Sequence, residues 1–192
     1  MARLQKVLLM YVMYEFEEWI GIPPEKVYNT DDINAVALQI LRDRLESTFD
    51  YELGIIIAVM DVEVEGEGYI IPMPNDPNAY FLARYKVLAF DAFENEVVKG
   101  VVRDVKAQGI FVDLGPIDGF VKKEQVLDEE LEILPDKRGY RSTESSKTIE
   151  IGDHVRARIT QISRSMVPSV RGLRIGMTMR QPYLGKEEWV RR

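Results

Sequence analysis

GVVRDVKAQGIFVDLGPIDGFVKK, residues 100–123, is the stretch that decides the fold of the second half of the chain. Apolar and polar residues alternate along it, and its glycines and its proline interrupt the alternation. This alternation is typical of half-buried strands, and the interruptions are typical of the turns between them. Within Gly109–Leu114, the aliphatic side chains belong on the core face, which leaves Phe111 on the outer face.

Outward from this stretch, the same pattern recurs after Phe93. Short strands are expected at Glu96–Lys106, Gly109–Leu114, Gly119–Lys122, His154–Ile162 and Leu173–Met177. Five short strands with glycine-rich turns indicate a small barrel, and the OB-fold is the five-stranded candidate. Residues 128–148 are acidic and then polar, which predicts a long exposed loop that is poorly ordered in its middle.

The first half has a different pattern. Thr30 is the expected N-cap of a helix, with Asp31 and Asp32 complementing the helix dipole. Apolar residues from Ile33 to Leu45 then recur at three- and four-residue spacing, so they form a core stripe. Four strands are expected around this helix: Tyr14–Ile22, which Pro23-Pro24 ends, Leu53–Glu65, Tyr69–Ile71 and Tyr80–Phe90. A turn is expected at Gly66–Gly68 and a loop at Pro72–Asn78.

This order of elements predicts two domains. Residues 1–93 form an α+β domain with one main helix on an antiparallel sheet. Residues 94–192 form an all-β OB-fold barrel. The two domains differ in charge, because residues 1–93 carry 7 basic and 16 acidic side chains, whereas residues 94–192 carry 18 and 16. Any surface that faces phosphate therefore belongs to the second domain.

The composition excludes several classes of protein. The chain of 192 residues has no cysteine, which excludes disulfides, thiolate metal sites and cysteine nucleophiles. No apolar run approaches the roughly 18–20 residues of a membrane-spanning helix, so we expect no membrane partner. The absence of cysteine is compatible with an intracellular compartment, and we expect a cytoplasmic location.

Catalytic and cofactor motifs are missing from the sequence. His154 is the single histidine, and no GxSxG, HExxH, Walker A or GxGxxG pattern occurs. One acidic run, Asp128, Glu129, Glu130 and Glu132, has the chemistry to hold a divalent metal, but such a run is usually a solvated surface. We therefore expect no catalytic residues, no metal and no cofactor.

The outer face of the barrel provides candidates for RNA binding. Phe111 is an expected stacking platform for a base; the alternative is that the long loop or a partner covers it. His154, Arg156 and Arg158 alternate with apolar residues along one strand, so they lie together on the outside. With Lys122 and Lys123 on another strand, they are expected to follow a phosphate backbone; the alternative is a merely solvated strand. The basic C-terminal tail contains a small apolar group, Tyr183, Leu184 and Trp189. This group packs either on the first domain or on a partner, and the sequence leaves both alternatives open.

Two motifs carry a resemblance to known families. Gly100-x-Val102-x-x-Val105, followed by Gly109-Ile-Phe-Val and Leu114-Gly-Pro-Ile-Asp-Gly119, resembles the RNA-binding OB-fold first described in ribosomal protein S-one. Met177-Thr-Met-Arg-Gln-Pro-Tyr-Leu-Gly185 is similar to the C-terminal signature of the E-prime subunit of archaeal RNA polymerase, counterpart of the eukaryotic seventh polymerase subunit. The resemblance spans residues 14–189.

The resemblance implies a non-catalytic stalk subunit of a DNA-dependent RNA polymerase. Its N-terminal domain, described in the family as truncated RNP-like, would dock on the polymerase core. The protein would pair with the polymerase's F subunit, and its OB domain would contact nascent single-stranded RNA. Residues 14–93 would be the docking domain, with core contacts at Pro23, Pro24, Gly66 and Gly68.

The sequence departs from the family pattern at three places. Pro72–Asn78 replaces a Pro-Gly-Asp-Gly segment, so this loop is expected to meet the core differently. Nucleic-acid-binding relatives have two aromatics and a histidine where this chain has Gln108, Phe111 and Lys122, which predicts one stacking ring and a weaker, more electrostatic contact. Residues 1–12 precede the usual start and are interpreted as an extra leader or an upstream start.

Two other functions are compatible with an OB-fold. A standalone RNA-binding protein of translation or RNA processing is disfavoured, because the acidic α+β half precedes the barrel. An RNA-processing enzyme, or a fixed part of one such as an exosome component, is disfavoured by the missing catalytic residues.

Overall fold

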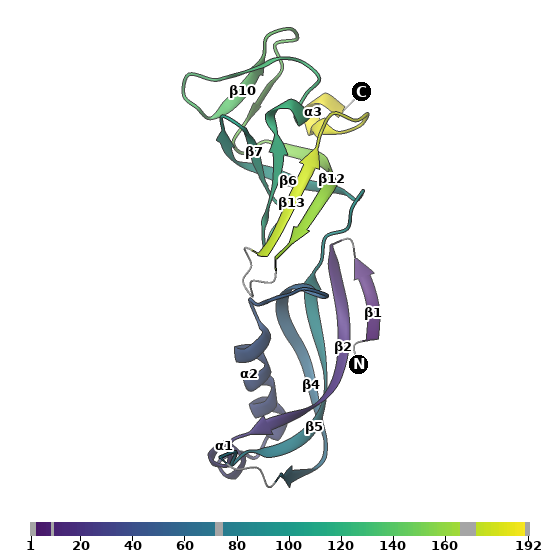
Figure 1. The fold of residues 1–192 in the computed structure, drawn as a ribbon, viewed down its shortest axis with the longest axis vertical. Coiled ribbons are helices and arrows are strands. Elements are labelled where there is room, and N and C mark those ends of the chain that lie inside the picture. The colour runs from purple at the N-terminus through teal and green to yellow at the C-terminus, as the bar shows by residue number, and fades with distance from the viewer. Residues whose placement is uncertain (1–2, 9, 72–74, 166–171, 191–192) are drawn as a thin grey trace. The chain divides into compact units, whose positions relative to one another are not determined.

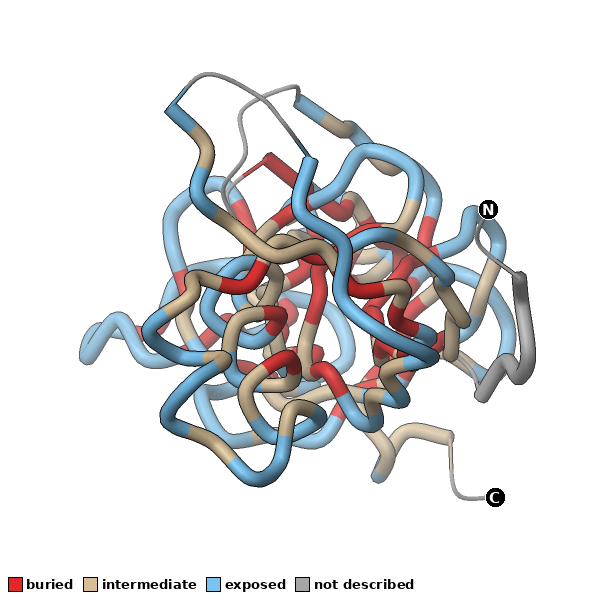
Figure 2. Tube along the Cα trace, turned by 90° about the horizontal axis from the view of Figure 1, so that it is seen from below, coloured by how far each residue is buried: buried red, intermediate tan, exposed pale blue. Residues whose placement is uncertain are grey.

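A computed structural model describes residues 3–8, 10–71, 75–165 and 172–190 of the chain. The chain divides into two compact units, Met1–Asp91 and Ala92–Arg192, and each unit has its own core. Figure 2 shows short buried stretches along the chain that alternate with half-buried and exposed ones.

The first unit is an antiparallel five-stranded sheet with one main helix on one face (Figure 1). The helix is α2 (Ile33–Leu45), and a short helix α1 (Pro24–Tyr28) precedes it. In order across the sheet, the strands are β1 (Arg3–Leu8), β2 (Tyr11–Ile22), β5 (Ala79–Phe90), β4 (Gly54–Ile70) and β3 (Phe49–Asp50). The predicted α+β architecture is confirmed.

The core of the first unit lies between α2 and the sheet. Ala37 and Leu41 are fully buried, and the other apolar residues of the predicted stripe are partly buried against the same cluster. Side chains at the two ends of α2 accept N–H groups of β4: Asn34 Oδ1 accepts the N–H of Val64 at 2.8 Å, and Oε1 of the C-cap Glu46 accepts the N–H of Val59 at 2.9 Å. N–H groups that are bonded in this way are not free to pair with another chain.

Several local predictions in the first unit were wrong. The N-cap of α2 is Asp32, not Thr30, because the Asp32 carboxylate accepts the backbone N–H groups of Asn34 and Ala35. The Thr30 hydroxyl instead accepts the N–H of Asp32. Pro23-Pro24 ends β2 as predicted, but Pro24 also begins α1, where its fixed φ suits the first helical turn.

Gly66–Gly68 was predicted as a turn, but it lies inside β4, where the register shifts between Glu65 and Tyr69. Gly66 has a φ of 71°, and a Cβ on Gly68 would come within 2.4 Å of the Phe81 ring. The glycines therefore permit a bulge and a close aromatic contact rather than a reversal of the chain. Of the predicted loop Pro72–Asn78, residues 72–74 lie outside the described residues.

Residues 3–8 of the predicted leader form β1, which pairs antiparallel with β2. Strand β2 accordingly begins at Tyr11, three residues before the predicted start. The segment is thus part of the sheet of the first unit.

The second unit contains a closed five-stranded barrel, as predicted. Strand β13 pairs antiparallel with β12 and parallel with β8, which closes the order β13-β8-β7-β6-β12 into a ring. The strands are β6 (Val97–Lys106), β7 (Gly109–Asp113), β8 (Asp118–Lys122), β12 (His154–Arg164) and β13 (Leu173–Thr178). A 3-10 turn η1 (Lys123–Gln125) follows β8, and β14 (Gly185–Lys186) and helix α3 (Glu187–Val190) end the unit.

The predicted loop 128–148 is not a disordered loop. It contains β9 (Leu131–Ile133) and β10 (Gly139–Ser142), which pair with β11 (Thr148–Glu150) in a separate three-stranded sheet. Tyr140 is 1% exposed, and its hydroxyl donates to the Lys106 carbonyl of the barrel. The acidic and polar composition obscured this sheet, because its few buried apolar side chains, such as Tyr140 and Ile149, are separated by polar residues.

Candidate nucleic-acid interface

Two phenylalanines lie side by side on the outer face of the barrel. Phe111 of β7 is directly opposite Phe120 of β8, and their ring centroids are 5.0 Å apart with planes inclined by 46°. Both rings are half-buried. They point outward because the residues that alternate with them are buried in the barrel core: Ile110, Val112, Gly119 and Val121. The predicted outward orientation of Phe111 is confirmed, and its ring is not sealed inside the barrel.

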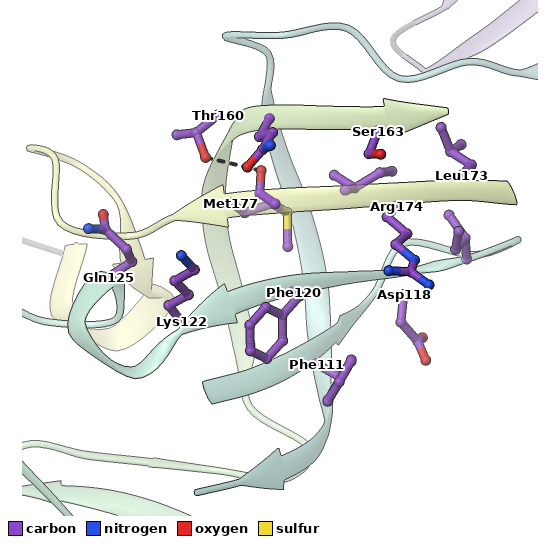
Figure 3. A pocket seen from close by; sticks show the side chains of 14 residues that line it. Phe111, Asp118, Phe120, Lys122, Gln125, Thr160, Ser163, Leu173, Arg174 and Met177 are labelled. Carbon is purple, nitrogen blue, oxygen red and sulfur yellow. Dashed lines mark hydrogen bonds between the residues drawn. The ribbon is translucent and has the colours of Figure 1, made fainter. Parts of the chain in front are cut away.

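The two rings lie along a cavity of about 1000 Å³ on the barrel surface (Figure 3). Polar side chains of β12 line another part of it, namely Thr160, Gln161 and Ser163. Gly176 of β13 is the register partner of Phe120, and a Cβ at that position would meet only Gln161 within 4 Å. The missing side chain therefore helps to keep the space beside Phe120 open.

Two cationic side chains border this cavity, together with one carboxylate that is paired with an arginine. Lys122 and Arg174 are exposed and line it, and Figure 3 shows them toward opposite ends of the phenylalanine pair. Asp118 also lines it, but its carboxylate accepts a hydrogen bond from Arg103 at 3.1 Å. That hydrogen bond, with the Asp118 charge, raises the pKa of Arg103. The negative charge of Asp118 thus has a partner, while Lys122 and Arg174 have no ion pair within the part of the chain that the structure describes.

The structure brings together only two of the predicted RNA-binding residues, Phe111 and Lys122. Lys123 lies in η1 and lines a separate hollow of about 260 Å³ together with Arg180. His154, Arg156 and Arg158 occupy the first half of β12, outside the lining of the large cavity. His154 is exposed there, whereas the buried Nε of Arg158 has no hydrogen-bond partner among the described atoms.

Phe120 and Arg174 are functional candidates that the sequence reasoning missed. The sequence predicted one stacking ring, whereas the structure places a second ring, Phe120, beside Phe111 across the strand pair. The signal was available, since Gly119 and Val121 alternate with Phe120 just as Ile110 and Val112 alternate with Phe111. Arg174 gave no such signal, because its position beside this face depends on the parallel pairing of β13 with β8.

The first unit has an exposed apolar surface at one end of its sheet. Trp19 of β2 is 51% exposed and Tyr69 of β4 is 60% exposed, with ring centroids 5.6 Å apart. Ile70 follows Tyr69 in β4 and is 78% exposed, but alternation along the strand turns it to the opposite face of the sheet. Carboxylates border these rings, and Arg84 bridges Glu17 at 2.9 Å and Glu65 at 3.0 Å. We call Trp19 and Tyr69 the terminal apolar patch.

The predicted core contacts lie on the elements that reach this end of the sheet. Pro23 and Pro24 join the end of β2 to α1, and Gly66 and Gly68 occupy the last part of β4 (Figure 1). Within the described residues, no group of three or more acidic or histidine side chains is arranged to hold a metal ion. No described helix is long and apolar enough to cross a membrane.

Comparisons with known proteins agree with this division of the chain. Residues 91–166 match the model of the S1 RNA binding domain. Residues 17–77 match the model of the SHS2 domain found in the N terminus of Rpb7p and Rpc25p. DNA-directed RNA polymerase subunit Rpo7 of Sulfolobus acidocaldarius is 32% identical over 94% of this chain and 95% of its own length.

The chain belongs to the Rpo7 family. Similarity extends to eukaryotic members, including RNA polymerase II subunit rpb7 of Schizosaccharomyces pombe, which is 26% identical over 73% of this chain and 79% of its own length. As an Rpo7-family protein, the chain is a component of DNA-directed RNA polymerase. Its phenylalanine pair lies within the region that matches the S1 domain.

Proposed function

We propose that this Rpo7-family chain is a non-catalytic component of the polymerase stalk in the cytoplasm, and that its barrel contacts nascent single-stranded RNA. One observation carries the RNA contact: the Phe111–Phe120 pair beside an open cavity with Lys122 and Arg174 on its border. The first unit docks on the polymerase core, and the whole chain pairs with the polymerase's F subunit.

The cavity is suited to RNA of any sequence. Every base has a π-face that stacks on an aromatic ring, so stacking on Phe111 and Phe120 does not select one base. Lys122 and Arg174 neutralise phosphates of the backbone that passes the rings. Double-stranded RNA keeps its bases stacked on each other, so the rings favour single strands.

A direct test is the affinity of the full chain for a fluorescent single-stranded RNA of about 12 nucleotides, within the range of OB-fold site sizes. We expect measurable binding that weakens with added salt, and weaker binding to the same sequence as a duplex. Equal binding of duplex and single strand would assign the cavity to backbone electrostatics alone and remove the role of the rings.

Replacing Lys122 by Ala should reduce RNA affinity for all sequences about equally. The slope of log affinity against log salt should become shallower by about 0.7, the contribution of one phosphate contact on a single strand. Lys26→Ala is the matched control, because Lys26 is an exposed lysine of the first unit. Fluorescence anisotropy titrations at several salt concentrations measure both slopes, and an unchanged Lys122→Ala slope contradicts the assignment.

Docking on the core is proposed for the terminal apolar patch, together with Pro23, Pro24, Gly66 and Gly68. Exposed aromatic side chains in one place are typical of protein interfaces, and removal of a central one often costs about 2 kcal/mol or more. Trp19→Ala and Tyr69→Ser should therefore each reduce retention of the polymerase core by roughly thirtyfold.

Retention of the core on immobilised chain measures this loss. The control is Tyr51→Ala, because Tyr51 is 55% exposed and precedes the opposite end of β4. Full retention by both patch variants contradicts docking through this surface. Pairing with the F subunit rests on family membership, and mass spectrometry of the proteins that co-purify with the native chain tests it.

A further inference from the structure

Tyr183 occupies a turn position that is unfavourable for its residue type. The N–H of Leu184 donates to the carbonyl of Gln181 at 3.1 Å, so Pro182 and Tyr183 are the two central residues of the turn. The φ of Tyr183 is 66°. Proline followed by a residue with positive φ is the arrangement of a type II turn, whose second central position normally holds Gly or Asn. A bulky side chain there carries a conformational cost.

The Tyr183 side chain does not offset this cost by packing. It is 79% exposed, so its ring is not part of the barrel core. Among the described non-glycine residues with positive φ, it is the only aromatic one; the others are Ser47, Asn75, Asn95, Lys137 and Ser146. A strained backbone that presents an exposed ring indicates a contact outside the chain.

The turn follows directly from a wall of the RNA cavity. Strand β13 lines the cavity and ends at Thr178, whose hydroxyl donates to Gln125 Oε1 at 2.7 Å. The next residue, Met179, donates its N–H to the Gln125 carbonyl at 2.8 Å. Gln125 and Lys122 lie at the end of the cavity away from Ser163 and Arg174 (Figure 3). The chain that leads into the Tyr183 turn is therefore fixed at the Lys122 end of the cavity.

We infer that Tyr183 is a third stacking platform for the same RNA, contacted by a nucleotide that has left the cavity at its Lys122 end. This inference rests on the proposed RNA contact of the barrel. The residues that precede Tyr183 in the chain include Arg180 and Gln181, which are exposed and polar. They differ from the apolar surroundings of a hot spot in a protein interface. An OB-fold covers between about 4 and 16 nucleotides of a single strand, so a strand bound in the cavity can extend beyond it.

Substitution by glycine separates a binding role from a structural one. Glycine favours the positive φ, so Tyr183→Gly should keep or raise the midpoint temperature of unfolding. The same variant of the full chain should bind an oligouridylate of about 12 nucleotides between about fivefold and a hundredfold more weakly. An oligouridylate of about 4 nucleotides, which is long enough only for the cavity, should bind as before.

Two further variants control the measurement. Tyr183→Phe retains the ring and should retain affinity for the longer RNA. Tyr28→Ala removes a tyrosine that is 85% exposed in the first unit and should change neither affinity. Anisotropy titrations at one salt concentration give all the values, and thermal unfolding confirms that each variant is folded.

The outcomes distinguish this inference from the proposed function. Loss of affinity for the longer RNA alone supports the third platform. Unchanged affinity of Tyr183→Gly for both RNAs overturns it and leaves the RNA contact of the cavity intact. Equal loss for both lengths also overturns it, because the variant then acts on the cavity itself. If the unaltered chain binds neither RNA, the proposed RNA contact fails, and this inference fails with it.

Discussion

Replacing both Phe111 and Phe120 by Ala is expected to weaken binding of single-stranded RNA by at least about thirtyfold. Each base that stacks on an aromatic ring contributes roughly 1–3 kcal/mol, and tenfold in affinity corresponds to about 1.4 kcal/mol. The two rings touch, with centroids 5.0 Å apart, so their contributions are coupled. The double variant should therefore lose a different amount of free energy from the sum of the single variants.

The matched control for this experiment is Phe93→Ala. Phe93 is a phenylalanine of the same unit, is 43% exposed, and does not line the cavity. Its removal should leave RNA affinity unchanged, whereas Phe120→Tyr should retain most of the affinity because an aromatic face remains. Anisotropy with one RNA at one salt concentration compares all variants. Wild-type affinity in the double variant would assign both rings to packing and end the stacking mechanism.

Tyr140→Ala is expected to destabilise the second unit by about 3–5 kcal/mol, the range for removal of a large buried aromatic side chain. Tyr140 is 1% exposed and links β10 to the barrel through its hydroxyl. Burial also raises the pKa of the Tyr140 hydroxyl. Tyr140→Phe should cost less, about 1–3 kcal/mol, because packing remains while the Lys106 carbonyl loses its donor.

Urea unfolding followed by circular dichroism and fluorescence measures these changes, with the two units allowed separate transitions. Tyr28→Ala is again the control, because an exposed tyrosine in the first unit should leave the second transition in place. A second transition in Tyr140→Ala at the wild-type urea concentration would mean that residues 128–148 are loosely attached, as the sequence alone suggested.

The parts of the fold that follow from local patterns were predicted well. The five barrel strands were each placed within one or two residues, because alternation has a period of two and turn residues interrupt it. The same alternation correctly placed Phe111 outside. The helix was predicted to begin after Thr30, two residues too early, but its apolar stripe from Ile33 to Leu45 was placed correctly because the stripe has helical spacing.

The errors arose where the conformation of a segment depends on a contact with a residue that is distant in sequence. Gly66 and Gly68 have the composition of a turn, but Phe81 on the adjacent strand makes them part of β4. The segment 128–148 has the composition of a loop, but it pairs into a small sheet, and Tyr140 of this sheet contacts the end of β6. Composition and spacing contain no information about either contact.

The sequence by itself determined the two-domain order, the barrel strands, the acidic and basic halves, and the family to which this polymerase component belongs. Only the tertiary structure decided which outward side chains share one surface. It placed Phe120 and Arg174 beside Phe111 and Lys122, and left Lys123, His154, Arg156 and Arg158 outside that cavity. The physical reason is that the direction of a side chain follows from its own strand, whereas its neighbours follow from the register and closure of strands far apart in the chain.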